Sequence, residues 1–142
     1  MGREMTTRAV GLTRVYHFSA AHCLGNAALS DAGNEALYGP CARPHGHNYY
    51  LEVTVAGVPD ALTGMAVDLG EIDRMVERSI LDQVDHHRLE DAPALVGVIT
   101  TGEGLARAFW DTLAAALPAG RLRRVSVQET AKNRFEYDGG EA

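Results

Sequence analysis

Hydrophobic and polar residues alternate along two N-terminal stretches of the chain in the manner of β-strands. Residues 8–20 are rich in Val, Tyr, Phe and Thr, which are the residue types that strands favour. Residues 47–57 alternate most clearly, with Leu51, Val53 and Val55 on one face of the expected strand. These two stretches are predicted to be neighbouring strands of one sheet.

Two later stretches repeat their hydrophobic residues at the spacing of an α-helix. Asp68 is a favourable N-cap and Glu71 completes a capping-box pattern, so the first helix is predicted to begin there. The second helix is predicted to start near Thr101 and to end before Pro118 and Gly120. The repeated apolar positions are Leu69, Ile72, Met75, Val76, Ile80, Leu105, Phe109, Leu113 and Leu117.

The remaining segments complete the expected pattern of elements. Residues 24–40 are rich in Gly, Asn, Ser, Asp and Pro and are predicted to form a long loop. Residues 65–67 are expected to form a short strand, and residues 122–130 a longer one. An extended piece around Phe135 and Tyr137 follows.

The order β-β-α-α-β-β predicts an α+β fold, in which two helices cover one face of an antiparallel sheet. The length of 142 residues fits a single domain over residues 1–142. Four main strands leave two edges of the sheet unpaired, and unpaired edges favour an oligomer that joins them.

Composition and charge narrow the function further. The chain is 46% hydrophobic and carries a net charge of −6, so a broad nucleic-acid surface is not expected. No apolar run approaches the ~20 residues that cross a bilayer, and no signal peptide is recognised, so the cytoplasm is the expected location. A phosphorylated small molecule remains compatible, because a few local Arg or Lys residues would bind it.

Three histidines form a candidate metal site. His45 and His47 are two residues apart and share a strand face, so both imidazoles can reach one point. Antiparallel pairing of the first two strands would place His22 beside them, whereas His17 has the opposite parity. Three histidines without a fourth protein ligand are typical of a catalytic zinc site. The alternative is that they are ordinary polar residues at a strand entrance.

Other reactive residues lie near these histidines in the sequence. Cys41 could be a fourth metal ligand, a disulfide partner of Cys23, or a reactive thiol whose pKa a metal and Arg43 would lower. Asp85 and His86 could form an acid–base dyad or an ordinary surface pair.

Glu129 lies at the end of the third long strand. A carboxylate can accept two parallel N–H bonds from an amidine-like edge, such as that of a pterin or a guanine. The alternative for Glu129 is a solvated strand end.

Taken together and in this order, the motifs resemble the 6-pyruvoyl-tetrahydropterin synthase and 6-carboxy-tetrahydropterin synthase family. The matching segments cover nearly the whole chain. They are Phe18-Ser19-Ala20-Ala21-His22, Leu29-Ser30-Asp31 with Asn34, Tyr38-Gly39-Pro40-Cys41, Pro44-His45-Gly46-His47-Asn48-Tyr49, Thr63-Gly64-Met65-Ala66-Val67-Asp68-Leu69, Val84-Asp85-His86, Thr101 with Glu103, and Glu129-Thr130 with Asn133.

The resemblance implies the tunnelling fold (T-fold), whose trimers close their sheets into a barrel and stack as homo-hexamers with active sites between subunits. It implies Zn²⁺ held by His22, His45 and His47, and 7,8-dihydroneopterin triphosphate as the substrate. The residues implied to act on the substrate are the general base Cys41, the relay Asp85 and His86, and the pterin-binding Glu129, Thr101 and Glu103. Arg43, Lys132 and Arg134 are candidate triphosphate contacts.

The product follows from finer features of the resemblance. The three residues between Cys41 and His45 resemble the carboxy-forming bacterial branch, so a lyase making 6-carboxy-tetrahydropterin for deazapurine (queuosine) biosynthesis is expected first. The segment 29–39 resembles the pyruvoyl branch, which is the alternative. Gly102 stands where the family usually has Thr or Ser, which also leaves open a non-catalytic pterin-binding relative. A structural zinc protein with Cys41 as the fourth ligand is a further alternative.

Overall fold

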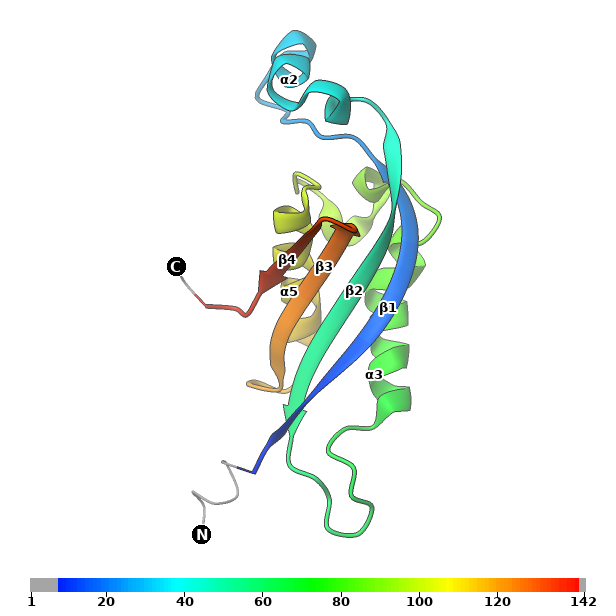
Figure 1. Ribbon diagram of the computed structural model, residues 1–142, viewed down its shortest axis with the longest axis vertical. Helices are drawn as coiled ribbons and strands as arrows, with labels where there is room; N and C mark the ends of the chain where they lie inside the picture. Colours follow the sequence, from blue (N-terminus) through cyan, green and yellow to red (C-terminus); the bar gives the residue numbers. More distant parts are fainter. Residues whose placement is uncertain (1–7, 141–142) are drawn as a thin grey trace.

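The computed structural model describes residues 8–140 as a four-stranded antiparallel sheet with helices on one face (Figure 1). The strands lie in the order β1-β2-β3-β4, so each pairs with its neighbour in the chain. The predicted α+β fold is therefore confirmed. The strands and α-helices are β1 (Val10–His22), α2 (Asp31–Tyr38), β2 (His45–Gly57), α3 (Leu69–Val76), α4 (Asp82–Val84), α5 (Gly102–Ala116), β3 (Leu122–Thr130) and β4 (Asn133–Tyr137).

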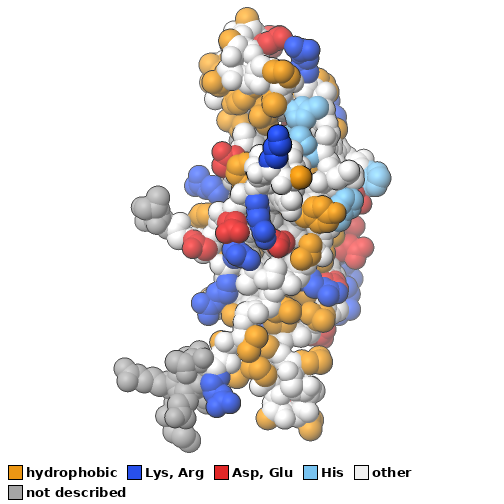
Figure 2. All heavy atoms as spheres, in the orientation of Figure 1, with side chains coloured by type: hydrophobic (Ala, Val, Ile, Leu, Met, Phe, Trp, Pro, Cys, Tyr) orange, Lys and Arg blue, Asp and Glu red, His pale blue; other side chains and the backbone are white. Residues whose placement is uncertain are grey.

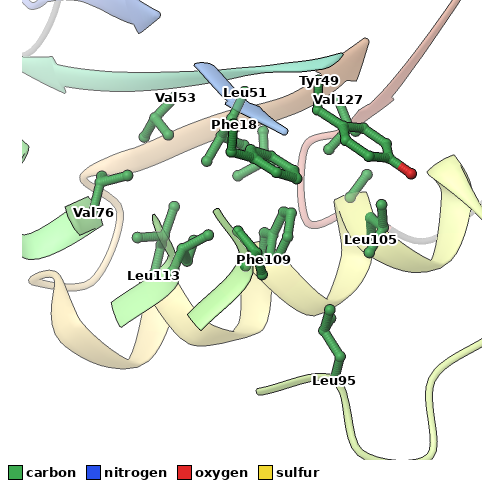
Figure 3. Packing of buried hydrophobic residues seen from close by; sticks show 14 of the residues in the cluster. Phe18, Tyr49, Leu51, Val53, Val76, Leu95, Leu105, Phe109, Leu113 and Val127 are labelled. Atoms are coloured by element: carbon green, nitrogen blue, oxygen red, sulfur yellow. The ribbon is translucent and has the colours of Figure 1, made fainter. Parts of the chain in front are cut away.

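The core lies between the sheet and the helices α3 and α5, which run behind it in Figure 1. Phe18 of β1 stacks on Tyr49 of β2 at 4.7 Å between ring centroids, and Phe109 of α5 meets Phe18 edge-on at 6.1 Å. Figure 3 shows these rings packed with Leu105 and Leu113, which were predicted as the buried side of the second helix. Burial of such a face is the main favourable term in folding.

The two helices start where the sequence predicted, and Asp68 is the cap that was expected for the first. The backbone N–H of Glu71 donates to the Asp68 carboxylate at 3.2 Å, and that of Gly104 donates to the Thr101 hydroxyl at 3.1 Å. The first helix continues from α3 through a π-helical segment, η2 (Glu77–Leu81), into α4. It thus reaches the Asp85–His86 segment.

Two predictions of local structure are wrong. The segment 24–40 was expected to be a loop, but it contains the eight-residue helix α2. Ser30 supplies the missing start signal, because its hydroxyl accepts the Gly33 N–H at 3.0 Å. Residues 65–67 form no strand, because they close a tight loop in which the Asp60 N–H donates to the Met65 carbonyl at 3.0 Å.

The two edge strands, β1 and β4, lie on opposite sides of the sheet. Part of the β1 edge is covered by the chain itself, since Ala21 N–H donates to the His87 carbonyl at 3.1 Å and Ala21 bridges to Arg88. Within residues 8–140, no helix is long and apolar enough to cross a membrane.

Candidate active site

Three histidines meet where β1 ends and β2 begins. The register pairs His22 directly with His45, and His47 lies two residues further along the same face. One ring nitrogen from each lies within 4.8 Å of the others, so the three side chains could hold a metal ion. His17 points to the opposite face, where its ring lies 5.3 Å from that of Tyr50. The strand parity used in the prediction therefore sorted the histidines as the structure does.

Hydrogen bonds fix the position of the proton in two of the three rings, His22 and His45. His22 Nδ1–H donates to the carbonyl of Thr100 at 3.0 Å, and the Tyr49 hydroxyl lies 3.3 Å from His22 Nε2, which can accept its proton. His45 Nδ1–H donates to the Arg43 carbonyl at 2.8 Å. A carbonyl only accepts, so the proton in both rings is on Nδ1 and the lone pair is on Nε2. Both rings are therefore in the tautomer that coordinates through Nε2.

The surroundings also favour the neutral form of His22 and His47. Burial, together with the positive charges that His45 and His47 would carry, lowers the pKa of His22 to about 4. Burial is likewise the main cause of the lowered pKa of His47, with His45 adding to it and Glu129 opposing it. Neutral imidazoles are the protonation state that binds metals. The residues thus fit a divalent cation with one coordination position left for a substrate.

Glu129 of β3 lies on the triad side of the sheet, half-buried. Its negative charge raises the pKa of His47 and adds to the rise in the pKa of the Tyr49 hydroxyl, for which burial is the main cause. Glu129 therefore faces the same space as the triad. The prediction placed it only at a strand end; the structure adds its neighbours.

Cys41 lies in the 3₁₀ turn η1 (Gly39–Ala42) and is exposed. Among the described residues, the metal-capable cluster consists of the three histidines and does not include Cys41. Cys23 and Cys41 are both free thiols. The structure therefore disfavours the fourth-ligand and disulfide alternatives, and it leaves the thiol accessible beside the entrance to β2.

Asp85 and His86 are held against the edge of β1 by a pair of hydrogen bonds. The Ser19 N–H donates to Asp85 Oδ1 at 3.0 Å, and the His86 N–H donates to the Ser19 carbonyl at 2.7 Å. His86 Nε2 is 3.7 Å from Asp85 Oδ1. His86 adopts a φ of 61°, a strained conformation that is enriched at functional sites.

The His86 side chain is 82% exposed and borders an open cleft of about 500 Å³ that His47 and Arg88 also line. Figure 2, in the orientation of Figure 1, shows histidine side chains gathered on the upper half of the visible face, with Lys and Arg side chains near them. The dyad therefore lies at the surface, across an open cleft from the half-buried His47.

The start of α5 follows directly on Thr100, which contacts His22 of the triad. The Thr101 hydroxyl is used as the N-cap of α5, and Glu103 is exposed. Gly102 is buried, and a Cβ there would lie 2.0 Å from Cδ2 of Phe135. The ring of Phe135 thus occupies the space that a Thr or Ser side chain would need, a contact that the sequence alone did not reveal.

The three candidate triphosphate contacts differ in their availability. Arg134 is engaged by Glu52 and by the Ser126 hydroxyl. Arg43 is 70% exposed, with one distant partner, Glu35, at 3.7 Å. Lys132 lies in the exposed turn between β3 and β4. Arg43 and Lys132 are therefore free to meet an anion, whereas Arg134 would have to leave existing partners.

Comparison with known proteins gives consistent matches. The family model described as 6-pyruvoyl tetrahydropterin synthase matches residues 11–140. A 6-pyruvoyl tetrahydrobiopterin synthase of Poecilia reticulata is 43% identical over 97% of this chain and 96% of its own length. The human protein of the same name is 40% identical over 90% of each chain.

A solved structure of 6-pyruvoyl tetrahydropterin synthase from Caenorhabditis elegans superposes with a TM-score of 0.85 at 35% identity. It covers 93% of this chain and 96% of its own. All three relatives carry the pyruvoyl name, so they favour the alternative product over the carboxy product that the Cys41–His45 spacing suggested.

Proposed function

Because the chain belongs to the 6-pyruvoyl tetrahydropterin synthase family, whose members are triphosphate-eliminating lyases, we propose that it converts 7,8-dihydroneopterin triphosphate to 6-pyruvoyl-tetrahydropterin. The observation that carries this proposal is the match along nearly the whole chain to relatives of that name. The proposal takes residues 1–142 as one catalytic domain acting in pterin biosynthesis in the cytoplasm.

The resident metal is proposed to be Zn²⁺, held by the Nε2 atoms of His22 and His45 together with His47. Their convergence within 4.8 Å and the lowered pKa values of His22 and His47 support this choice. When bound, Zn²⁺ would supply Lewis acidity to the hydroxyl groups of the substrate side chain. The chain's own contribution is a pre-oriented triad in which burial favours the neutral, metal-binding form of His22 and His47.

Proton transfer is proposed to fall to Cys41, Asp85 and His86. The exposed Cys41 thiol can remove a side-chain proton once it is deprotonated. Asp85 accepts the Ser19 N–H and lies near His86 Nε2, so it can stabilise a protonated imidazole that then returns the proton. The hydrogens move within the substrate, so no redox cofactor is required, and triphosphate leaves.

Substrate recognition is proposed to use Glu129 for the amidine-like edge of the pterin, with Thr101 and Glu103 at the start of α5. The half-buried position of Glu129 beside His47 supports this role, because a partly desolvated carboxylate makes stronger hydrogen bonds. Because the Thr101 hydroxyl already accepts the Gly104 N–H, Thr101 would contribute mainly through its backbone groups. Arg43 and Lys132 are the proposed triphosphate contacts.

A homo-hexamer built from two trimers is part of the proposal. Cys41 and the dyad are exposed, and β1 and β4 are unpaired edges in the described chain. Joining copies through these edges would remove the open edges and could bring the exposed groups of one chain to the triad of another.

The carboxy-forming reaction is the second candidate, and the three-residue gap between Cys41 and His45 favours it. That reaction would also release acetaldehyde. An alcohol dehydrogenase coupled to the reaction would record acetaldehyde as consumption of NADH, and the proposed pyruvoyl reaction predicts none.

The chemistry is tested by measuring triphosphate release from 7,8-dihydroneopterin triphosphate. Zinc-loaded protein is expected to turn over, and chelator-treated protein to stop until zinc is returned. The Cys41→Ala variant is expected to lose at least about a hundredfold in rate, as expected for loss of a general base, whereas Cys23→Ala, the matched control, keeps its rate. Equal rates for the two cysteine variants would overturn the role of Cys41.

A further inference from the structure

Glu90 reaches toward the histidine triad from η3 (Leu89–Asp91), a 3₁₀ turn that has no role in the proposed function. Its Oε1 accepts the backbone N–H of Cys23 at 2.7 Å and the hydroxyl of Thr100 at 3.4 Å. Its Oε2 is buried and, among the described residues, has no hydrogen-bond partner. A carboxylate oxygen buried in this way lowers stability, so the carboxylate at this position calls for a physical explanation.

Both groups that Glu90 accepts from lie next to His22, one along the chain and the other against its ring. Cys23 is the next residue in the chain, so its N–H sits directly behind the His22 backbone. Thr100 holds the His22 ring, because its carbonyl is 3.0 Å and its hydroxyl 3.2 Å from Nδ1. Glu90 thus joins the backbone side of His22 to the segment that holds its ring.

The arrangement has a direct consequence for the ring of His22. The Thr100 hydroxyl that donates to Glu90 cannot also donate its proton to His22 Nδ1. Nδ1 therefore keeps its own proton, which it donates to the Thr100 carbonyl, and Nε2 keeps its lone pair. Without Glu90, the hydroxyl could rotate and donate to Nδ1, which would favour the tautomer that cannot coordinate through Nε2.

We propose that Glu90 is a positioning residue of the metal site, which fixes the tautomer and orientation of His22 through Thr100 and the Cys23 N–H. This inference rests on the proposed binding of a divalent cation by the triad. Groups that orient histidine ligands in this way typically account for about 10- to 100-fold in metal affinity.

The first test is the Zn²⁺ affinity of the purified full chain, measured by competition with a chromophoric chelator. Glu90→Ala is expected to bind about 10- to 100-fold more weakly than the wild type. Glu90→Gln keeps an acceptor oxygen but loses the charge, and its Zn²⁺ affinity is expected to stay within about threefold of the wild type. It therefore shows whether the hydrogen bonds of Glu90 or its negative charge matter for the affinity. Asp91→Asn, which removes an exposed charge from the same turn, is the matched control and should bind like the wild type.

Thr100→Val is the second variant, in case Glu90→Ala does not fold. It removes the hydroxyl but keeps the carbonyl, so its Zn²⁺ affinity should fall by less than that of Glu90→Ala and stay below the wild type.

Nitrogen-15 NMR of the metal-free protein gives a readout independent of zinc. The wild type should show His22 protonated on Nδ1 alone, and Glu90→Ala should show a mixture of tautomers.

The outcomes separate this inference from the proposed function. Wild-type zinc affinity in both Glu90→Ala and Thr100→Val, with an unchanged His22 tautomer, would overturn the role of Glu90 and leave the metal site intact. Failure of the wild-type chain to bind zinc would instead overturn the proposed metal site. In that case, the tautomer measurement still decides whether Glu90 orients His22.

Discussion

The contact between Gly102 and Phe135 gives the sharpest prediction about stability. A Cβ at position 102 would lie 2.0 Å from Cδ2 and 2.2 Å from Cε2 of the Phe135 ring, well inside contact distance. The ring would have to move out of its place, and overpacking of this kind costs about 1–3 kcal/mol. Replacing Gly by Ala in a helix gains at most about 1 kcal/mol. The Gly102→Ala variant is therefore expected to lose about 1–2 kcal/mol, which lowers the melting temperature by about 3–7 °C in a chain of this size.

The assay is a double-mutant cycle followed by thermal and urea denaturation. In a Phe135→Ala background the ring is gone, so adding Gly102→Ala should be neutral or stabilise by up to about 1 kcal/mol. Gly11→Ala is the control, since a Cβ there meets only Thr54 at an ordinary 3.9 Å, and it should change stability by less than about 0.5 kcal/mol. An equal effect of Gly102→Ala in both backgrounds would refute the reasoning.

Three further predictions concern the triad and the missed helix. His22→Ala should abolish zinc binding, while His17→Ala, on the opposite face, should bind zinc as the wild type does; equilibrium dialysis with metal analysis compares them. The lowered pKa values of His22 and His47 mean that the unfolded chain binds more protons below about pH 6.5. Metal-free protein should therefore lose stability as the pH falls from about 6.5 toward 4, by at most about 1.4 kcal/mol per pH unit for each histidine. Urea titrations at several pH values measure this; a free energy of unfolding that does not change with pH would contradict the burial argument. Ser30→Ala removes the cap on the Gly33 N–H and should cost about 1 kcal/mol in the same titrations.

Much of the site could be predicted because strand geometry is strict. Side chains alternate with a period of two, and consecutive strands pair as antiparallel neighbours, so His22, His45 and His47 had to share one face once the strands were recognised. His17 was excluded by the same rule. The Asp68 cap could be predicted because a cap depends only on residues three or four positions away. The second helix was predicted to start near Thr101, and the structure adds that the Thr101 hydroxyl is its cap.

What the sequence could not reveal depends on contacts between distant segments. Glu90 reaches Cys23 across 67 positions of the chain, and Phe135 covers Gly102 from another element. No local pattern marks either contact. The helix α2 was missed for a different reason, since Gly33 and Asn34 lower its helix propensity and its Ser30 cap was taken as a loop signal.

The product choice shows the limit of a single spacing. The gap between Cys41 and His45 lies in a turn, where insertions and deletions are tolerated best, so its length constrains chemistry weakly. Identity spread over 90% or more of the chain carries more weight, and it favours the pyruvoyl product.

The central claim is tested most directly by the mass of the pterin formed from 7,8-dihydroneopterin triphosphate by the zinc-loaded protein. The account predicts a tetrahydropterin that keeps a three-carbon pyruvoyl side chain, formed together with triphosphate. A tetrahydropterin that carries only a carboxyl group, accompanied by acetaldehyde, would contradict the proposed product. Recovery of unchanged substrate would contradict the proposed catalysis itself.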